Sequence, residues 1–372
     1  MSYVTSGEGG AARRLRWRSE GPPPSARLGR ADDSSRADAA FRRVQRGEHL
    51  LYAGDYHNAR QLLAALGRRL RPPRPRETLA ESFLAERRFR RRERDLLSRL
   101  LVPVDDTFAV ALRRAPEAAR EALREVWGAP DGEPSAVPLR ELLGLIGAHE
   151  WRRKGVPVPA LGAAVHPHYG VFAPVRGEYV TLVAEALARR RLAGQLAFDV
   201  GTGTGVLALL AAKAGARVRA TDADPRAVAC ARENAERLGL AGQVELEQRD
   251  LFPAGRADLV LCNPPWIPAE PLGALDHAVY DPKGRFLAAF LEGLPAHLAP
   301  GGEALLVISD LAERLGLRPE GALLASIAAA GLQVADRREA RPSHPRARDA
   351  ADPLHAARAA EVTTLYVLRA TS

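Results

Sequence analysis

The sequence has few cysteines and no long apolar run. Its two cysteines, Cys230 and Cys262, form no C-x-x-C pattern and lie near no histidine cluster. Neither a disulfide framework nor a structural zinc site is expected, and a reducing cytoplasm fits this usage. No run of 18 apolar residues is present, so we expect no transmembrane helix. The first 20 residues lack an apolar segment, and we therefore expect no secretory signal peptide.

Lysine is also scarce, and this weakens the apparent meaning of the net charge of +9. Of 54 basic residues, only Lys154, Lys213 and Lys283 are lysine, a bias typical of a GC-rich genome. Residues 1–75 carry 15 basic and 7 acidic residues, whereas residues 151–372 carry 26 and 24. The excess therefore lies near the N-terminus. It fits either a tail that contacts RNA or a solvated tail whose arginines reflect codon usage.

Composition divides the chain into three parts. Residues 1–37 are rich in Gly, Pro, Ser, Arg and Asp, and we predict a disordered basic tail. For residues 38–153 we predict a helical domain. It starts with a helix pair whose second member is capped by Asp55, followed by helices at about 76–101, 107–127 and 139–153.

Residues 154–372 have a different sequence pattern, in which short apolar runs alternate with segments of helical periodicity. This alternation predicts an α/β domain with a mainly parallel sheet that is covered on both faces. Seven strands are predicted, the last of them after a long connection: 196–200, 217–221, 244–248, 258–262, 304–308, 332–337 and 363–369.

A glycine-rich turn follows the first of these strands. It consists of Gly201, Thr202, Gly203, Thr204 and Gly205. Glycine allows a tight turn and lets a ligand approach the backbone amides. A dinucleotide site would have a third glycine where Val206 stands. Asp199, two residues before the turn, instead fits a methyl-donor site, because its carboxylate can hold the cationic amino end of methionine.

Acidic residues also end the next two strands. Asp222 lies 21 residues after Gly201, a spacing that suits a carboxylate accepting hydrogen bonds from ribose hydroxyls. Asp224 precedes Pro225 and is expected to cap a helix. After the third strand, Asp250 can accept from an adenine amino group while Leu251 packs on the ring.

The most specific motif is Asn263-Pro264-Pro265-Trp266, at the end of the fourth strand. The Asn263 carboxamide oxygen and the Pro264 carbonyl can both accept hydrogen bonds from an NH₂ group. Trp266 offers a flat face for a planar amide or nucleobase. Together the four residues are predicted to be catalytic, clamping a weakly nucleophilic nitrogen with its lone pair toward a sulfonium methyl group.

With these motifs, the region 171–369 resembles the class I methyltransferases of the "methyltransferase small" superfamily. That group includes release-factor glutamine methyltransferases and rRNA guanine N2 methyltransferases. The resemblance implies a Rossmann-like sheet of seven strands with the last antiparallel. It places the glycine turn, Asp222, Asp250 and Asn263 at donor and substrate positions. Phe172 and Pro174 lie in a segment, 172–178, that resembles the one that closes over the donor. The departures are Trp266 in place of the usual Tyr, the long leader, and the loop 267–285.

The resemblance implies S-adenosyl-L-methionine as cofactor and N-methylation of a macromolecular acceptor, protein or RNA. A protein amide is favoured, because residues 151–372 carry little net charge. A nucleic-acid base amine is the alternative. A third hypothesis, of another class, is a catalytically silent donor-binding scaffold. No metal is expected, because His166 and His168 form an H-x-H pair without an apparent third ligand. The sequence leaves the oligomeric state open.

Overall fold

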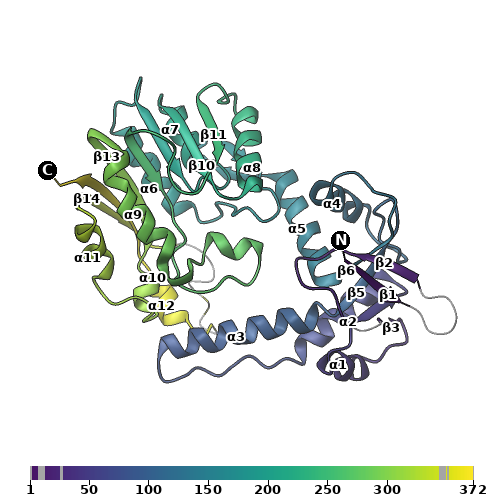
Figure 1. Ribbon diagram of the computed structural model, residues 1–372. Helices are drawn as coiled ribbons and strands as arrows, with labels where there is room; N and C mark the ends of the chain where they lie inside the picture. The colour runs from purple at the N-terminus through teal and green to yellow at the C-terminus, as the bar shows by residue number, and fades with distance from the viewer. Residues whose placement is uncertain (1, 7–12, 26–27, 343–348, 350–351, 372) are drawn as a thin grey trace. The chain divides into compact units, whose positions relative to one another are not determined.

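The structure, a computed structural model, describes residues 2–6, 13–25, 28–342, 349 and 352–371. The chain divides into two compact units (Figure 1). The first comprises Met1–Arg74 and Leu84–Glu150, and the second Pro75–Phe83 and Trp151–Ser372. No helix among the described residues is both long and apolar enough to cross a membrane.

The first unit is built on a six-stranded mixed sheet of order β1-β2-β6-β5-β4-β3. Strands β3, β4 and β5 are parallel, and β6 pairs antiparallel to β5. The strands are β1 (Tyr3–Ser6), β2 (Arg13–Trp17), β3 (Gly29–Asp32), β4 (Leu50–Ala53), β5 (Leu100–Val104) and β6 (Ser135–Pro138). The helices are α1 (Ala37–Gln45), α2 (Tyr56–Arg68), α4 (Glu117–Trp127) and α5 (Leu139–Lys154), while α3 (Leu79–Leu97) starts in the second unit's segment and ends in the first.

Two predictions for this half are wrong. The described part of residues 1–37 contains three strands rather than a disordered tail. Residues 38–153 contribute three further strands to the same mixed sheet, so they are not a purely helical domain. Strand β2 buries Leu15 between arginines and pairs with the mostly polar β1. Its other partner, β6, is distant in the sequence, since Arg16 pairs with Ser135, and neither feature leaves a clear periodicity. Strands β4 and β5 are apolar runs of four or five residues. In runs this short, hydrophobic periodicity cannot distinguish a strand from part of a helix. The Asp55 cap is confirmed, since its side chain accepts from the His57 backbone N–H at 2.9 Å.

The second unit contains the predicted seven-stranded sheet, with order β11-β10-β9-β12-β13-β15-β14. Only the contacts of β15 are antiparallel, so the Rossmann-like fold with an antiparallel last strand is confirmed. The strands are β9 (Leu196–Val200), β10 (Arg217–Asp222), β11 (Val244–Gln248), β12 (Ala257–Cys262), β13 (Leu298–Ser309), β14 (Leu332–Ala340) and β15 (Thr363–Ala370).

Helices cover both faces of this sheet because successive strand residues point to opposite sides. Ala197 belongs to the core formed with α6 (Gly177–Ala188) and α7 (Val206–Lys213). Its neighbour Phe198 packs in the opposite core with α9 (Arg285–His297) and α11 (Ala322–Ala329). Helix α8 (Pro225–Arg237) joins the α6 and α7 side through Ala235. Two well-packed cores thus hold the strand ends rigidly.

The remaining elements are short. A hairpin of β7 (Val156–Val158) and β8 (Ala163–Val165) encloses η1 (Pro159–Leu161). The connection after β12 contains η2 (Ala274–Ala278) and η3 (Pro282–Gly284), while α10 (Leu311–Arg314) follows β13 and α12 (His355–Ala360) precedes β15. Strands β9 to β12 are parallel, so their carboxyl ends meet at one edge, where ligands bind in open α/β sheets.

Candidate functional site

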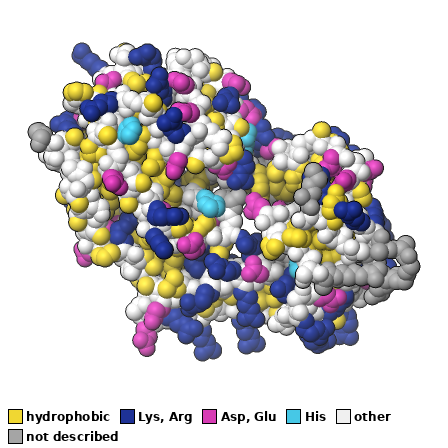
Figure 2. Space-filling view, in the orientation of Figure 1, with side chains coloured by type: hydrophobic (Ala, Val, Ile, Leu, Met, Phe, Trp, Pro, Cys, Tyr) yellow, Lys and Arg dark blue, Asp and Glu magenta, His cyan; other side chains and the backbone are white. Residues whose placement is uncertain are grey.

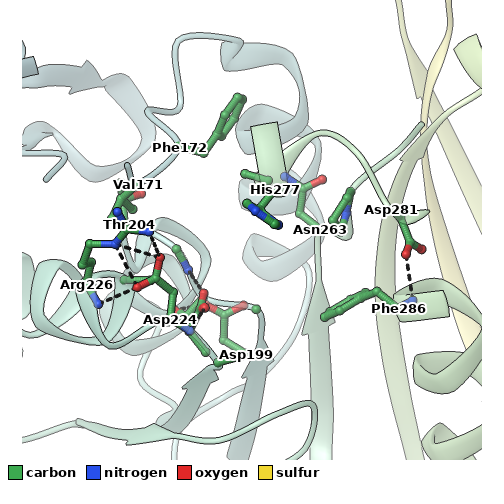
Figure 3. A pocket seen from close by; sticks show the side chains of 18 of the residues that line it. Val171, Phe172, Asp199, Thr204, Asp224, Arg226, Asn263, His277, Asp281 and Phe286 are labelled. Carbon is green, nitrogen blue, oxygen red and sulfur yellow. Dashed lines mark hydrogen bonds and ion pairs between the residues drawn. The ribbon is translucent and has the colours of Figure 1, made fainter. Parts of the chain in front are cut away.

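A cavity of about 530 Å³ lies at the carboxyl edge of β9, β10 and β12 (Figure 3). Its size is ordinary for a small-molecule site. Eleven of the predicted residues line it: Phe172, Asp199, Gly201, Thr202, Gly203, Thr204, Asp222, Asp250, Leu251, Asn263 and Pro265. Pro174, Gly205, Pro264 and Trp266 are not in its lining. The tertiary structure therefore brings the donor and acceptor motifs to one cavity.

The turn after β9 needs glycine for two different reasons. Gly201 and Gly203 have φ values of 74° and 55°, in the left-handed region that L side chains rarely adopt. Gly205, with φ 83°, starts α7, and a Cβ there would lie 3.0 Å from the Cβ of Ala231 on α8. Gly205 thus serves the packing of α7 against α8, whereas the other two glycines shape the cavity floor.

Asp199 is buried beneath this turn, with 1% of its surface exposed. Its Oδ2 accepts from the Thr202 hydroxyl at 2.6 Å and from the Ala208 N–H at 3.0 Å. Burial raises the pKa of Asp199 to about 6, because the charged form loses its hydration. Asp199 forms no ion pair with any residue that the structure describes, and a buried carboxylate of this kind at a cavity is well suited to receive a ligand's ammonium group.

Asp222 lies at the end of β10 and faces the same cavity. It accepts the backbone N–H groups of Gly203 at 3.0 Å and of Asp224 at 2.9 Å. Burial raises its pKa. Asp224 caps α8 by accepting from Arg226 N–H at 2.9 Å, as predicted, and pairs with the Arg226 guanidinium (Figure 3). Asp224 was predicted only to cap a helix, but it also lines the cavity.

The tip after β11 places Asp250 and Leu251 at the cavity. Asp250 is exposed and Leu251 is half-buried. Leu251 has a φ of 58°, an uncommon conformation for a residue with a Cβ, and its carbonyl accepts from the Thr221 hydroxyl. This hydrogen bond helps to hold the strained turn, and such strain clusters at ligand sites.

The motif after β12 is divided between cavity and core. Asn263 and Pro265 line the cavity, whereas Pro264 is buried. The Trp266 indole Nε1–H donates to the Asn263 Oδ1 at 3.0 Å. Its ring packs, partly buried, against three apolar clusters. Sequence reasoning assigned Trp266 a stacking face, but in the structure its ring lies outside the cavity lining and its indole engages Asn263.

Several lining residues were missed. Phe286, at the start of α9, would lie 3.4 Å from a Cβ placed on Gly201. Asp281 holds this helix start by accepting from the N–H groups of Phe286 at 3.0 Å and Leu287 at 3.1 Å (Figure 3). The Asp281-Pro282 dipeptide is a helix-start signal that could have indicated this position. His277 reaches the cavity from η2, a position that no local pattern indicates.

The segment before α6 covers another part of the cavity. Val171 packs with Ala227 and Cys230, and Phe172 follows it into the lining. The preceding histidines are tied to α8: His166 N–H donates to the Asn234 Oδ1 at 2.8 Å, and His168 Nε2 lies 2.8 Å from Glu233 Oε2. These contacts fix the segment at the cavity. Within the described part of the chain, no group of three or more His, Cys, Asp and Glu is arranged so that it could hold a metal ion.

The lining fits S-adenosyl-L-methionine chemically. That donor carries an ammonium group, a ribose diol and an adenine. The cavity offers the buried Asp199, the Asp222 carboxylate at 21 residues from the turn, and the Asp250–Leu251 tip. Positive-φ glycines leave the turn open to close approach.

Comparison with known proteins gives matches in a family model, in solved structures and in named relatives. Residues 180–286 match the family model described as "Ribosomal protein L11 methyltransferase (PrmA)". Of the solved structures, an S-adenosylmethionine-dependent methyltransferase from Geobacter sulfurreducens in complex with S-adenosyl-L-homocysteine aligns with a TM-score of 0.37 and 20% identity, over 58% of this chain and 99% of that one.

Named relatives include two release factor glutamine methyltransferases. The one from Cereibacter sphaeroides is 45% identical over 125 residues, which are 30% of this chain and 45% of the relative. The one from Deinococcus radiodurans is 33% identical over 212 residues, which are 53% of this chain and 71% of the relative. The chain thus spans less than half of the first relative's length and more than two thirds of the second's. With these shared residues, it belongs to the release factor glutamine methyltransferase family of the class I S-adenosylmethionine-dependent methyltransferases.

Proposed function

We propose that this protein transfers a methyl group from S-adenosyl-L-methionine to a planar nitrogen of a protein, a glutamine-like side-chain amide. The observation that supports this most directly is Asn263 in the lining of the same cavity as Asp199 and Asp222. An amide acceptor and a methyl donor held there would lie next to each other. The names of the relatives, release factor glutamine methyltransferase and ribosomal protein L11 methyltransferase, denote protein acceptors, in agreement with this acceptor class.

The predicted residues other than Trp266 receive the following roles in this proposal. Asp199 holds the donor's ammonium group, Asp222 the ribose hydroxyls, and Asp250 with Leu251 the adenine. Phe172 and Pro174 belong to the covering segment, and the glycine turn lets the backbone approach the donor. Asn263 Oδ1 and the Pro264 carbonyl accept hydrogen bonds from the acceptor NH₂, while Pro265 shapes the wall between the two ligands.

The donor, when bound, supplies an electrophilic methyl group on a sulfonium sulfur. The protein's part is positional. Hydrogen bonds in the amide plane hold the nitrogen so that its lone pair points out of that plane, toward the methyl group. With a donor bound, the nitrogen–carbon bond would form as the carbon–sulfur bond breaks. S-adenosyl-L-homocysteine would leave, and the methylated nitrogen would lose one proton to solvent. In this proposal, Asn263 Oδ1 and the Pro264 carbonyl accept the hydrogen bonds that orient the nitrogen.

Charge favours a protein acceptor over a nucleic acid. The second unit carries 27 basic and 26 acidic residues, so it has almost no net positive charge. Figure 2 shows basic and acidic side chains interspersed over its visible face. Nucleic-acid sites require an excess of Lys and Arg to neutralise phosphates. The presence of both Asn263 and the glycines of the turn also argues against a silent scaffold, because a degenerate site would not need them.

The test uses an extract of cells that lack this protein, incubated with the purified chain and methyl-labelled donor. We expect label in macromolecules that protease removes and RNase leaves. Asn263→Ala serves as the control for incorporation by contaminating enzymes. Label sensitive to RNase alone would transfer the proposal to a nucleic-acid amine. No label with any extract, together with tight binding of S-adenosyl-L-homocysteine, would favour the scaffold.

A further inference from the structure

The side chain of Asn263 is oriented by one specific contact. An indole N–H is a donor only, so it pairs with the carboxamide oxygen and not with the NH₂ group. The opposite rotamer would set two donors against each other. Oδ1 has two acceptor positions, and the indole occupies one of them. The second stays available for an acceptor amide. Trp266 therefore determines which end of the Asn263 carboxamide is presented to a substrate.

The Trp266 ring is itself held by a charged side chain. The Arg176 guanidinium carbon lies 5.7 Å from the ring centroid, within the range of a cation–π contact. Arg176 forms a two-pronged ion pair with Glu361, with both nitrogen–oxygen distances 2.9 Å. A paired fork fixes the plane of the guanidinium as well as its place.

Glu361 anchors this arrangement in the sheet. It is fully buried, and the hydroxyl of Ser309 at the end of β13 donates to its Oε1 at 2.7 Å. The residues come from four places in the sequence: the segment before α6, the end of β13, the residue after α12, and the motif after β12. A buried carboxylate needs such partners to be stable. A rigid connection thus runs from the strand ends to the carboxamide of Asn263.

We infer that Trp266 and Arg176 are positioning residues for methyl transfer, Trp266 by fixing the Asn263 carboxamide and Arg176 by fixing the Trp266 ring against Glu361. This rests on the proposed function, in which Asn263 holds the acceptor nitrogen. Neither residue lines the cavity proposed for the donor, so we expect their loss to affect turnover and to leave donor binding in place. The indole N–H makes this arrangement specific to tryptophan, because Phe and Tyr at the same position have no donor at that point of the ring.

Trp266→Phe tests this with little loss of apolar packing, and Trp151→Phe is the matched control because Trp151 is exposed. We expect Trp266→Phe to lower kcat at least tenfold at saturating donor, with the Kd for S-adenosyl-L-homocysteine within twofold of the parent. Arg176→Lys keeps the charge but loses the fork, and should lower kcat several-fold. Trp151→Phe should change neither. Unchanged kcat in Trp266→Phe overturns the inference.

A second measurement needs no acceptor, so it separates this inference from the proposed function. Labelling with ¹⁵N-tryptophan gives one indole N–H signal for each of the four tryptophans, and the signal lost in Trp266→Phe is that of Trp266. We expect that signal to exchange with water at least tenfold more slowly than the Trp151 signal. Asn263→Ala should abolish this protection, and Arg176→Lys should shift the resonance. Exchange as fast as that of Trp151 would refute the orientation of Asn263 by Trp266, whether or not an acceptor is found.

Discussion

Asp222 Oδ2 accepts the backbone N–H of Gly203 at 3.0 Å, which ties the end of β10 to the turn after β9. The carboxylate expected to meet the ribose is thus held in place before any donor binds. Preorganisation of this kind lowers the cost of ordering a site on binding. The contacts that hold Asn263 on the acceptor side are separate from this contact between Asp222 and Gly203.

The two sides should respond oppositely to mutation. Asp222→Ala removes the ribose partner and should weaken donor affinity by about 1–3 kcal/mol, the cost of unsatisfied polar groups. Asn263→Ala should leave donor affinity within a few-fold but lower turnover on the order of a hundredfold, because it removes a positioning contact. Calorimetry with S-adenosyl-L-homocysteine and single-turnover methylation measure the two effects. Loss of donor binding in Asn263→Ala with a normal rate at saturating donor would contradict the placement of the acceptor.

Asp199 predicts a pH dependence of donor binding. Burial raises its pKa from 3.8 to about 6, so the carboxylate is protonated and neutral below that pH. An ammonium group binds the ionised form, and affinity should therefore fall with pH. We expect S-adenosyl-L-homocysteine to bind about tenfold more weakly at pH 5 than at pH 8. Asp199→Asn should bind weakly at both values, and a parent profile flat down to pH 5 would show that Asp199 does not hold the ammonium group.

The same shift affects the stability of the ligand-free protein. A carboxyl group whose pKa is higher in the folded state than in the unfolded one binds more protons when folded. Stability should therefore decrease as the pH rises from about 4 to about 6, and this contribution should level off above 6. Urea unfolding of the parent and of Asp199→Asn, compared at pH 4.5 and 7, measures it. The free energy of unfolding of Asp199→Asn, relative to that of the parent, should be higher at pH 7 than at pH 4.5.

Substitutions of two glycines in the turn should have different effects, one on the packing of the helices and the other on donor binding. In Gly205→Ala the new Cβ would lie 3.0 Å from Ala231 in a positive-φ conformation, so we expect a loss of about 1–3 kcal/mol in unfolding free energy. In Gly203→Ala the Cβ meets nothing within 4 Å, and only the backbone cost of about 1 kcal/mol remains. Because Gly203 lines the cavity, its variant should lose donor affinity at least tenfold. Equal melting temperatures for the two variants would count against this division.

Both thiols should be inert in the folded protein. Burial raises the pKa of Cys230 to about 12 and that of Cys262 well above its usual value. The thiolate is the reactive form, so Ellman's reagent at pH 8 should label neither residue until denaturant is added. Cys230→Ser and Cys262→Ser identify which thiol reacts first during unfolding. Rapid labelling of the native protein would mean that α8 or the end of β12 opens readily.

The sequence predicted the second unit well, for a physical reason. Its strands are apolar runs between glycine, proline and acidic residues, and Asp224-Pro225 marks a helix start, so local signals agree with the tertiary fold. The first unit was predicted wrongly because Leu15 and Leu50 lie in strands of four or five residues that pair with distant segments. A short apolar run contains no local signal that identifies the strand with which it pairs. The site was predicted as a set of strand ends, and the structure brought eleven of its residues to one cavity.

What the amino-acid sequence determined by itself is the chemistry at the strand ends: glycines where φ is positive, carboxylates at the ends of β9 and β10 and after β11, and the carboxamide of Asn263 after β12. Backbone conformation and functional groups are properties of single residues at fixed spacing. The tertiary structure alone decided that Trp266 directs its N–H to Asn263, that Arg176 and Glu361 meet across 185 positions, and that Phe286 closes over Gly201. These contacts join segments that share no local pattern, so only the packing of the sheet and its helices could bring them together.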